Sequence, residues 1–241
     1  MRKDPISVHV DTPVDEVIQT IEKYNLVAVP VVDSIGRLVG RITVDDVMDE
    51  VREQAERDYQ LASGLSQDVE TDDSVFRQTT ARLPWLLIGM LGGIGNSMIL
   101  GNFDSTFAAH PEMALYIPLI GGTGGNVGTQ SSALVVQGLA NSSLDANNTW
   151  KQILKESVVA LINATIISML VYVYNFIRFG ATATVSYSVS LSLFAVVMFA
   201  SIFGTLVPMT LEKMKIDPAI ATGPFISITN DIIGMLLYMG I

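Results

Sequence analysis

Three groups of residues in this sequence could bind a cation, and the first lies in residues 121–130. Five glycines stand there among polar side chains. Asn126, Thr129 and Gln130 recur at i, i+3 and i+4, so a helix would place their oxygens on one face. Glycines permit close helix contact, and a loosened backbone could also present carbonyl groups to a cavity. Because close packing explains the glycines but not the polar side chains, we predict that this segment lines a pore.

The second group centres on Asp231, which we expect to be the only acidic residue well inside a membrane span. A carboxylate inside a bilayer is costly and marks a functional site by default. The structural alternative is an aspartate that is hydrogen-bonded to a neighbouring helix. No Lys or Arg is expected inside the spans, so protons or a passing cation would have to balance the charge of Asp231. The pair Gly223-Pro224 is expected to bend this span and free a carbonyl group.

The third group is a row of acidic residues on a predicted helix at residues 44–63. At 100° per residue these carboxylates fall within roughly 140° of arc, and Arg57 is the only cation among them. One interpretation is a solvated acidic face. The other is a site for Mg²⁺ or Ca²⁺, because hard divalent ions prefer carboxylate oxygens and would relieve the repulsion. The row consists of Asp45, Asp46, Asp49, Glu50, Glu53 and Glu56.

The charges that surround these groups divide the chain into two parts. Of 241 residues with net charge −10, the first 83 hold 17 acidic and 9 basic residues, and the remaining 158 hold 7 and 5. Only 16% of the chain is charged, whereas soluble domains carry about 25%. We therefore predict a membrane domain at residues 83–241 behind an acidic N-terminal part.

Long intervals without Asp, Glu, Lys or Arg predict five membrane crossings, since about 20 apolar residues span a bilayer core. Basic residues favour the cytoplasmic side, and six of the seven in the flanking loops lie on the side of the N-terminal part. We expect a multi-pass protein of the inner or plasma membrane, with its N-terminus in the cytoplasm and its C-terminus outside. The intervals are 83–103, 113–144, 157–177, 179–211 and 218–241, the last interrupted by Asp231.

The N-terminal residues 1–43 have the pattern of a small α/β module. Thr12 is expected to cap the first helix, with Pro13 in its first turn. Residues 64–82 are predicted to form a linker and an amphipathic lead-in to the first crossing. The predicted order is strand, helix, strand, strand and helix, at residues 7–10, 14–21, 27–32, 38–43 and 44–63.

The N-terminal part resembles a CBS module. The resemblance rests on Val-Pro-Val-Val-Asp at 29–33, Gly-Arg-Leu-Val-Gly at 36–40 and Ile-Thr-Val-Asp-Asp-Val at 42–47. Such modules work in pairs, and one is present here. In these modules the pattern matched by Gly40, Thr43 and Asp46 can hold a nucleotide ribose. The resemblance therefore implies an adenine nucleotide such as ATP as an alternative to a purely structural role.

The chain as a whole resembles the MgtE family of magnesium channels, in the order CBS module, connecting "plug" helix and five crossings. The specific signatures are Pro118 with residues 124–130, and residues 217–218, 224–225, 229–231 and 234. The resemblance implies a homodimer with one pore on the two-fold axis. Asp231 of each chain would supply a carboxylate pair, and the oxygens near it and near Asn126 would complete the site. The pore residues implied are Asp231, Asn126, Thr129, Gln130, Gly125 and Asn230.

The same resemblance implies that cytosolic Mg²⁺ bridges the acidic surfaces of the CBS module and the plug helix and closes the pore. By position, that role falls to Asp45, Asp46, Asp49, Glu50 and Glu53. The family pattern also contains an acidic N-terminal helical domain and a first CBS module, which this sequence lacks. Gln54 and Arg57 interrupt the acidic pattern of the plug helix. We therefore expect ion-dependent closure to be weaker or lost in this chain.

The expected fold is thus an α-helical polytopic membrane protein with a small α/β CBS module, and the expected function is Mg²⁺ conduction rather than catalysis. The lack of cysteine excludes thiolate metal sites, and the acidic balance argues against nucleic acid. A single intramembrane aspartate argues against an aspartyl protease, which needs two. Membrane lipid, divalent cations and a second copy of the chain are the expected partners. The alternatives are an ion-coupled secondary transporter of another divalent cation and a membrane sensor that reads a nucleotide.

Overall fold

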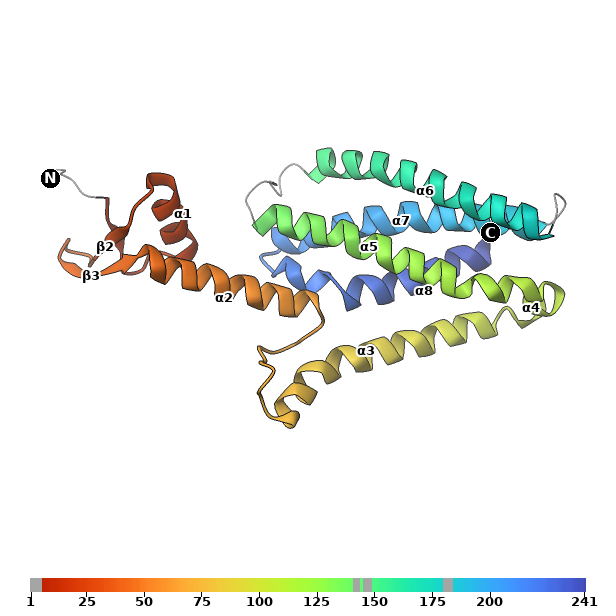
Figure 1. Ribbon diagram of the computed structural model, residues 1–241, viewed down its shortest axis with the longest axis horizontal. Helices are drawn as coiled ribbons and strands as arrows, with labels where there is room; N and C mark the ends of the chain where they lie inside the picture. The colour runs from red at the N-terminus through yellow and green to blue at the C-terminus, as the bar shows by residue number, and fades with distance from the viewer. Residues whose placement is uncertain (1–5, 141–143, 145–148, 180–183) are drawn as a thin grey trace. The chain divides into compact units, whose positions relative to one another are not determined.

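The computed structural model describes residues 6–140, 144, 149–179 and 184–241 (Figure 1). The chain divides into two compact units, Met1–Asp58 and Tyr59–Ile241. Helix α2 (Val44–Ala62) begins in the first unit and ends in the second.

The first unit has the predicted order of strand, helix, strand, strand and helix. Its three-stranded sheet has the order β1-β2-β3, in which β1 pairs parallel with β2 and β2 pairs antiparallel with β3. The parallel pair requires a crossover, which α1 provides, whereas β2 and β3 form a hairpin. The elements are β1 (Val8–His9), α1 (Val14–Tyr24), β2 (Ala28–Val32), β3 (Leu38–Thr43) and the start of α2.

The start of α1 differs from the prediction. Pro13 occupies the N-cap position and no side chain caps the helix. The Thr12 hydroxyl instead accepts a hydrogen bond from the backbone N–H of His9, at 2.9 Å. The predicted threonine cap is therefore wrong, because Thr12 closes the turn between β1 and α1 and is occupied there.

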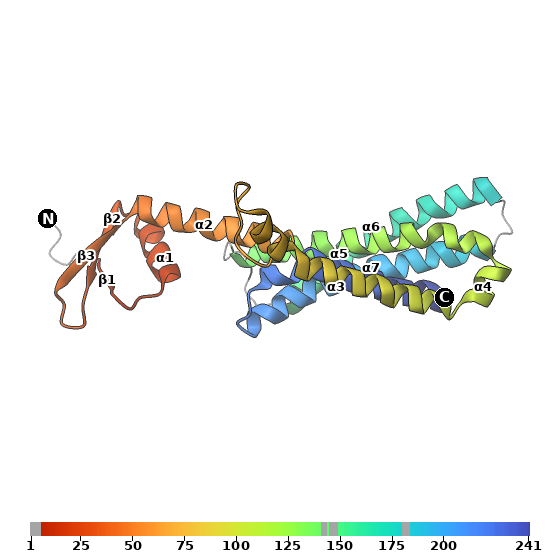
Figure 2. The ribbon, with the colours of Figure 1, turned by 90° about the horizontal axis from the view of Figure 1, so that it is seen from below.

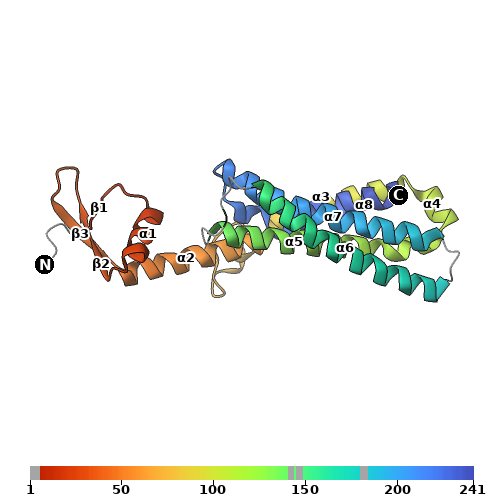
Figure 3. The ribbon, with the colours of Figure 1, turned by 90° about the horizontal axis from the view of Figure 1, so that it is seen from above.

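A small hydrophobic core holds the first unit together. Val8 and Val29 from the sheet, Val17 and Ile21 from α1, and Val47 from α2 are buried against one another. Figure 3 shows α1 and the first turns of α2 beside the sheet. The acidic row of α2 therefore belongs to a helix whose first turns are anchored by packing.

The second unit is helical. Helix α5 packs against α7 and α8, α6 packs against α7, and α3 packs against α8. Figures 1 and 2 show α5, α7 and α8 running side by side, with α3 and α6 on opposite sides of them. The elements are α3 (Val75–Gly101), α4 (Asp104–Ala109), the 3₁₀ helix η1 (Pro111–Tyr116), α5 (Ile117–Ala140), α6 (Thr149–Phe179), α7 (Thr184–Lys213), the 3₁₀ helix η3 (Pro218–Ala221) and α8 (Pro224–Gly240).

Among the described residues, three helices are long and apolar enough to cross a membrane: Val75–Gly101, Thr149–Arg178 and Val185–Lys213. Helix α5 is rich in glycine and polar residues, and α8 has 17 residues, about 26 Å at 1.5 Å per residue. A bilayer core is about 30 Å thick. The count of five crossings therefore stays a prediction.

Three local features of the second unit bear on the sequence analysis. Residues 117–140 form a continuous α-helix, so of the two uses open to the glycine run, close helix contact and a loosened backbone, the structure has the first. Pro224 stands in the first turn of α8 and starts that helix instead of bending it. Helix α3 begins at Val75, within residues 64–82 of the predicted linker and amphipathic lead-in, because Ser74 caps it by accepting from the backbone N–H of Arg77 at 3.4 Å.

Candidate cation site

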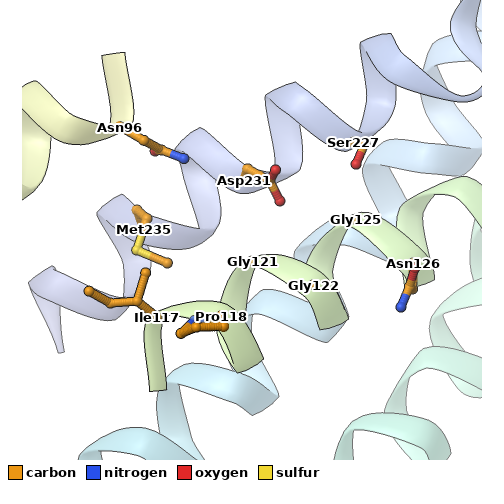
Figure 4. A pocket seen from close by; sticks show the side chains of 10 residues that line it. All are labelled: Asn96, Ile117, Pro118, Gly121, Gly122, Gly125, Asn126, Ser227, Asp231 and Met235. Carbon is orange, nitrogen blue, oxygen red and sulfur yellow. The ribbon is translucent and has the colours of Figure 1, made fainter. Parts of the chain in front are cut away.

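A cavity of about 320 Å³ lies between α3, α5 and α8, and Asp231 of α8 reaches into it (Figure 4). Among the described residues that line this cavity, Asp231 is the one charged side chain, and it is partly buried. The lining consists of Asn96, Ile117, Pro118, Gly121, Gly122, Gly125, Asn126, Ser227, Asp231 and Met235. We name it the Asp231 cavity.

Glycines of α5 leave the space that the Asp231 carboxylate occupies. A Cβ atom built on Gly121 would lie 3.4 Å from Oδ1 of Asp231. One built on Gly125 would lie 3.6 Å from the same oxygen and 2.8 Å from Oγ of Ser227. Gly121 and Gly125 are one helical turn apart, so their bare backbone forms the wall that faces the carboxylate.

Gly128 of α5 serves close packing. A Cβ on Gly128 would lie 1.8 Å from Nδ2 of Asn230, and one on Gly204 of α7 would lie 2.4 Å from the carbonyl oxygen of Gly128. Asn230 is 1% exposed, and neither oxygen nor nitrogen of its amide has a hydrogen-bond partner among the described residues. The glycine run thus has two faces, one toward the Asp231 cavity and one toward α7 and the buried side of α8.

The residues predicted to line the pore separate into three places. Asn126 and Gly125 lie with Asp231 in the Asp231 cavity. Gln130 lines a second cavity. Asn230 and Thr129 line neither of these two cavities; Thr129 donates its hydroxyl hydrogen to the carbonyl oxygen of Gly125, at 2.8 Å.

The second cavity, of about 490 Å³, contains an acidic residue that the sequence analysis missed. Glu156 lies within α6 and is 8% exposed. Glu156 is an acidic residue of a helix, Thr149–Arg178, that is long and apolar enough to cross a membrane. Glu156 adjoins the charge-free interval 157–177, so the charge pattern excluded it from the span. The helix itself begins earlier, at Thr149, and therefore contains Glu156.

Half of the acidic row of α2, three of its six carboxylates, is paired with arginines of the same helix. Arg57 bonds Glu53 at 2.6 Å and Glu50 at 3.1 Å, and Arg52 bonds Glu56 at 3.1 Å. Arg52 thus joins Arg57 as a cation of this helix. No group of three or more His, Cys, Asp or Glu among the described residues is arranged to hold a metal ion. In this single chain the row is a line of carboxylates along a helix and does not converge on a point.

Thr43 and Asp46 cap the first turn of α2. Oδ2 of Asp46 accepts from the Thr43 hydroxyl at 2.6 Å and from the Thr43 backbone N–H at 2.8 Å. These bonds lower the pKa of the Asp46 carboxyl, the hydroxyl bond contributing most. Of the residues matched to a nucleotide ribose site, two are therefore engaged in a helix cap, and Gly40 lies on the exposed strand β3.

Comparison with known proteins assigns the chain to a family. A model of the MgtE divalent cation transporters matches residues 117–241, just over half of the chain, which include the glycine face and Asp231. The chain belongs to the MgtE family. A CBS-domain model matches residues 1–53. Together with its long apolar helices, membership of MgtE identifies a multi-pass membrane protein with a small N-terminal CBS module.

Three curated relatives carry the name magnesium transporter MgtE. The chain is 34% identical to the one from Bacillus subtilis (strain 168) over 227 residues, which are 94% of this chain and 50% of the relative. It is 31% identical to the one from Enterococcus faecalis over 236 residues, which are 98% of this chain and 52% of that relative. It is 32% identical to the one from Thermus thermophilus over an alignment of 247 residues, gaps included, which covers 100% of this chain and 54% of that relative. The chain thus spans about half the length of these relatives.

Proposed function

We propose that this protein carries Mg²⁺ across the membrane and that Asp231 binds the ion on its way. The observation that carries the proposal is the Asp231 cavity, where one carboxylate faces a wall of bare glycine backbone. Mg²⁺ is usually held through one or two carboxylates and keeps several of its waters. The glycines leave room for those waters. The relatives named as magnesium transporters support the choice of ion.

A homodimer would complete the site in this proposal. One chain supplies a single carboxylate to the Asp231 cavity, and a two-fold axis beside it would supply a second from the same residue. Helix α3 also leaves large apolar side chains exposed, including Leu86, Met90, Leu91, Ile94 and Met98. In the proposed assembly these side chains face lipid or the second copy.

We also propose that cytosolic Mg²⁺ at the acidic row of α2 regulates conduction. The end of α2 lies against the start of α8: a Cβ on Gly223 would lie 2.1 Å from the carbonyl oxygen of Ala62, and one on Gly64 would lie 2.6 Å from Cγ of Pro224. A displacement of this end of α2 would therefore reach the helix that carries Asp231. Regulation requires the N-terminus to be cytoplasmic, as the basic loop residues favour.

Proteoliposomes test the proposal. With Mg²⁺ outside and a dye for Mg²⁺ inside, we expect influx that increases with an inside-negative potential set by K⁺ and valinomycin. We expect no accompanying proton movement, measured with an internal pH dye. Mg²⁺ flux that does not change with the membrane potential and requires a proton or Na⁺ gradient would instead show an ion-coupled secondary transporter. No Mg²⁺ flux under any gradient would contradict the proposal.

A further inference from the structure

Three helices of the second unit bring polar groups together around a buried carboxylate, at a place apart from the Asp231 cavity. Oε1 of Glu156 on α6 accepts from the hydroxyl of Ser131 on α5 at 2.6 Å and from that of Ser201 on α7 at 2.5 Å. The two hydroxyl oxygens are 3.0 Å apart. Ser131 is 4%, Glu156 8% and Ser201 2% exposed. The carboxylate is therefore held in one orientation by neighbours from two other helices.

These hydrogen bonds orient Glu156 but leave its charge uncompensated. Both serine hydroxyls bond Oε1, and the structure gives Oε2 no bond to any described residue. Lys155 lines the same cavity, yet it forms no ion pair with Glu156 within 4.0 Å in the described part of the chain. A buried carboxylate is costly unless a proton, a cation or a metal ion accompanies it.

The cavity beside Glu156 has room and ligands for a hydrated cation. Its volume is about 490 Å³, whereas six waters take up about 180 Å³ at about 30 Å³ each. Side-chain amides and hydroxyls form much of its wall, and none of its lining residues is shared with the Asp231 cavity. The polar and charged residues of the wall are Gln130, Ser131, Gln137, Gln152, Lys155, Glu156, Asn163 and Ser201.

We propose that Glu156, oriented by Ser131 and Ser201, binds a hydrated divalent cation in this cavity, and that Lys155 opposes the ion. The amides of Gln130 and Asn163 hold waters of the bound ion. Lys155 directly precedes Glu156 in the sequence and carries a charge of the same sign as the ion, so it weakens binding. This site is separate from Asp231 and does not depend on the proposed function of Asp231.

Labelling with dicyclohexylcarbodiimide tests the site without any substitution. This apolar reagent reacts with carboxyl groups inside membranes, and mass spectrometry of peptides separates Glu156 from Asp231. We expect Mg²⁺ to protect Glu156 in the full chain in liposomes, at constant ionic strength set with choline chloride. Half-protection should need the same Mg²⁺ concentration in the Asp231→Asn variant. Labelling of Glu156 that Mg²⁺ leaves unchanged, or protection that is lost with Asp231→Asn, overturns the proposal.

Two lysine variants test the opposing charge. Lys155→Gln should lower the Mg²⁺ concentration for half-protection of Glu156 severalfold, because the repulsion is removed. Lys151→Gln, one turn earlier on α6 and outside the cavity lining, is the matched control and should leave it unchanged. Equal protection curves for both variants and the wild type would contradict the role given to Lys155. Loss of Mg²⁺ flux with intact protection of Glu156, or the reverse, separates this site from the proposed function.

Discussion

Glycines on the two faces of α5 have different roles. Gly121 and Gly125 clear space in front of Asp231, while Gly128 lets Asn230 and the α7 backbone come close. Helix α5 therefore contains glycines whose substitution should affect ion passage and glycines whose substitution should affect packing. Gly122 faces open space, with nothing within 4 Å of a built Cβ.

A pair of alanine variants separates the cavity from the helix. Gly125→Ala would place its methyl 2.8 Å from Oγ of Ser227 and close to Asp231, so we expect Mg²⁺ flux to fall severalfold. Gly93→Ala on α3 gains the same helix propensity, about 1 kcal/mol, has nothing within 4 Å of its built Cβ, lies outside the lining of the Asp231 cavity, and should conduct like the wild type. Equal fluxes from the two variants in liposomes would contradict the cavity assignment.

The capping carboxylate of α2 predicts a pH dependence. The pKa of Asp46 is lowered in the folded chain, so the cap stabilises the first turn of α2 above the unfolded pKa of about 3.9. That contribution is lost as the pH falls through the lower, folded pKa. Hydrogen exchange of the α2 amides should be faster in Asp46→Ala than in the wild type at pH 7. The difference between the two proteins should vanish at pH values below the folded pKa of Asp46. A difference that persists below the folded pKa would contradict this account of the cap.

At the scale of elements, the end of α2 packs against the start of α8 at a junction within the second unit. Gly223 has a φ of +56° and Gly64 a φ of +81°, conformations that a residue with a Cβ adopts only with strain. Both also lack room for a side chain, because Ala62 and Pro224 lie against them. Geometry and contact thus require glycine at the same two positions.

Gly223→Ala should destabilise the second unit by about 1–3 kcal/mol from backbone strain alone, with the contact against Ala62 in addition. Gly240→Ala, on the same helix with nothing within 4 Å of its built Cβ, is the control and should unfold like the wild type. Chemical denaturation in detergent, followed by circular dichroism, measures both. If Gly223→Ala unfolds at the same denaturant concentration as Gly240→Ala, the junction is looser than described.

Local patterns predicted the elements well and the contacts between distant residues poorly. The β-branched runs around the 33–36 turn gave the order of the first unit, which its strands and helices confirm. The glycine run alone left both a loosened backbone and close helix contact open, and packing against α7 and α8 holds residues 117–140 helical. Glu156 stands just before the charge-free interval 157–177, and its partners Ser131 and Ser201 lie 25 and 45 residues away, so no local pattern singled it out.

At the scale of the whole molecule, the net charge of −10 reflects an acidic first unit joined to a membrane unit with few charges. Membership of the MgtE family accounts for this division, because a CBS module and the domain that the MgtE family model matches meet in one chain. In the proposed function the acidic row senses the ion that the Asp231 cavity passes. The internal pairing of Glu50, Glu53 and Glu56 with arginines leaves Asp45 and Asp49 as its most available carboxylates.

Regulation by Mg²⁺ predicts that the ion protects the first unit from protease. Asp45→Asn combined with Asp49→Asn should raise the Mg²⁺ concentration needed for half-protection, because the two most available carboxylates of the row are lost while the Asp46 cap is kept. Asp11→Asn with Asp15→Asn removes the same charge from exposed positions outside α2 and should leave the protection curve unchanged. Coincident curves for the two double variants would return the row to the role of a solvated acidic face.

Mg²⁺ flux through Asp231 variants in liposomes tests the central claim most directly. Asp231→Ala and Asp231→Asn remove the one charge of the Asp231 cavity, and each should abolish potential-driven Mg²⁺ influx. Asp104→Asn removes an exposed carboxylate from α4 and should conduct like the wild type. Flux in Asp231→Ala equal to that of Asp104→Asn would contradict the assignment of Asp231 as the residue that binds the ion.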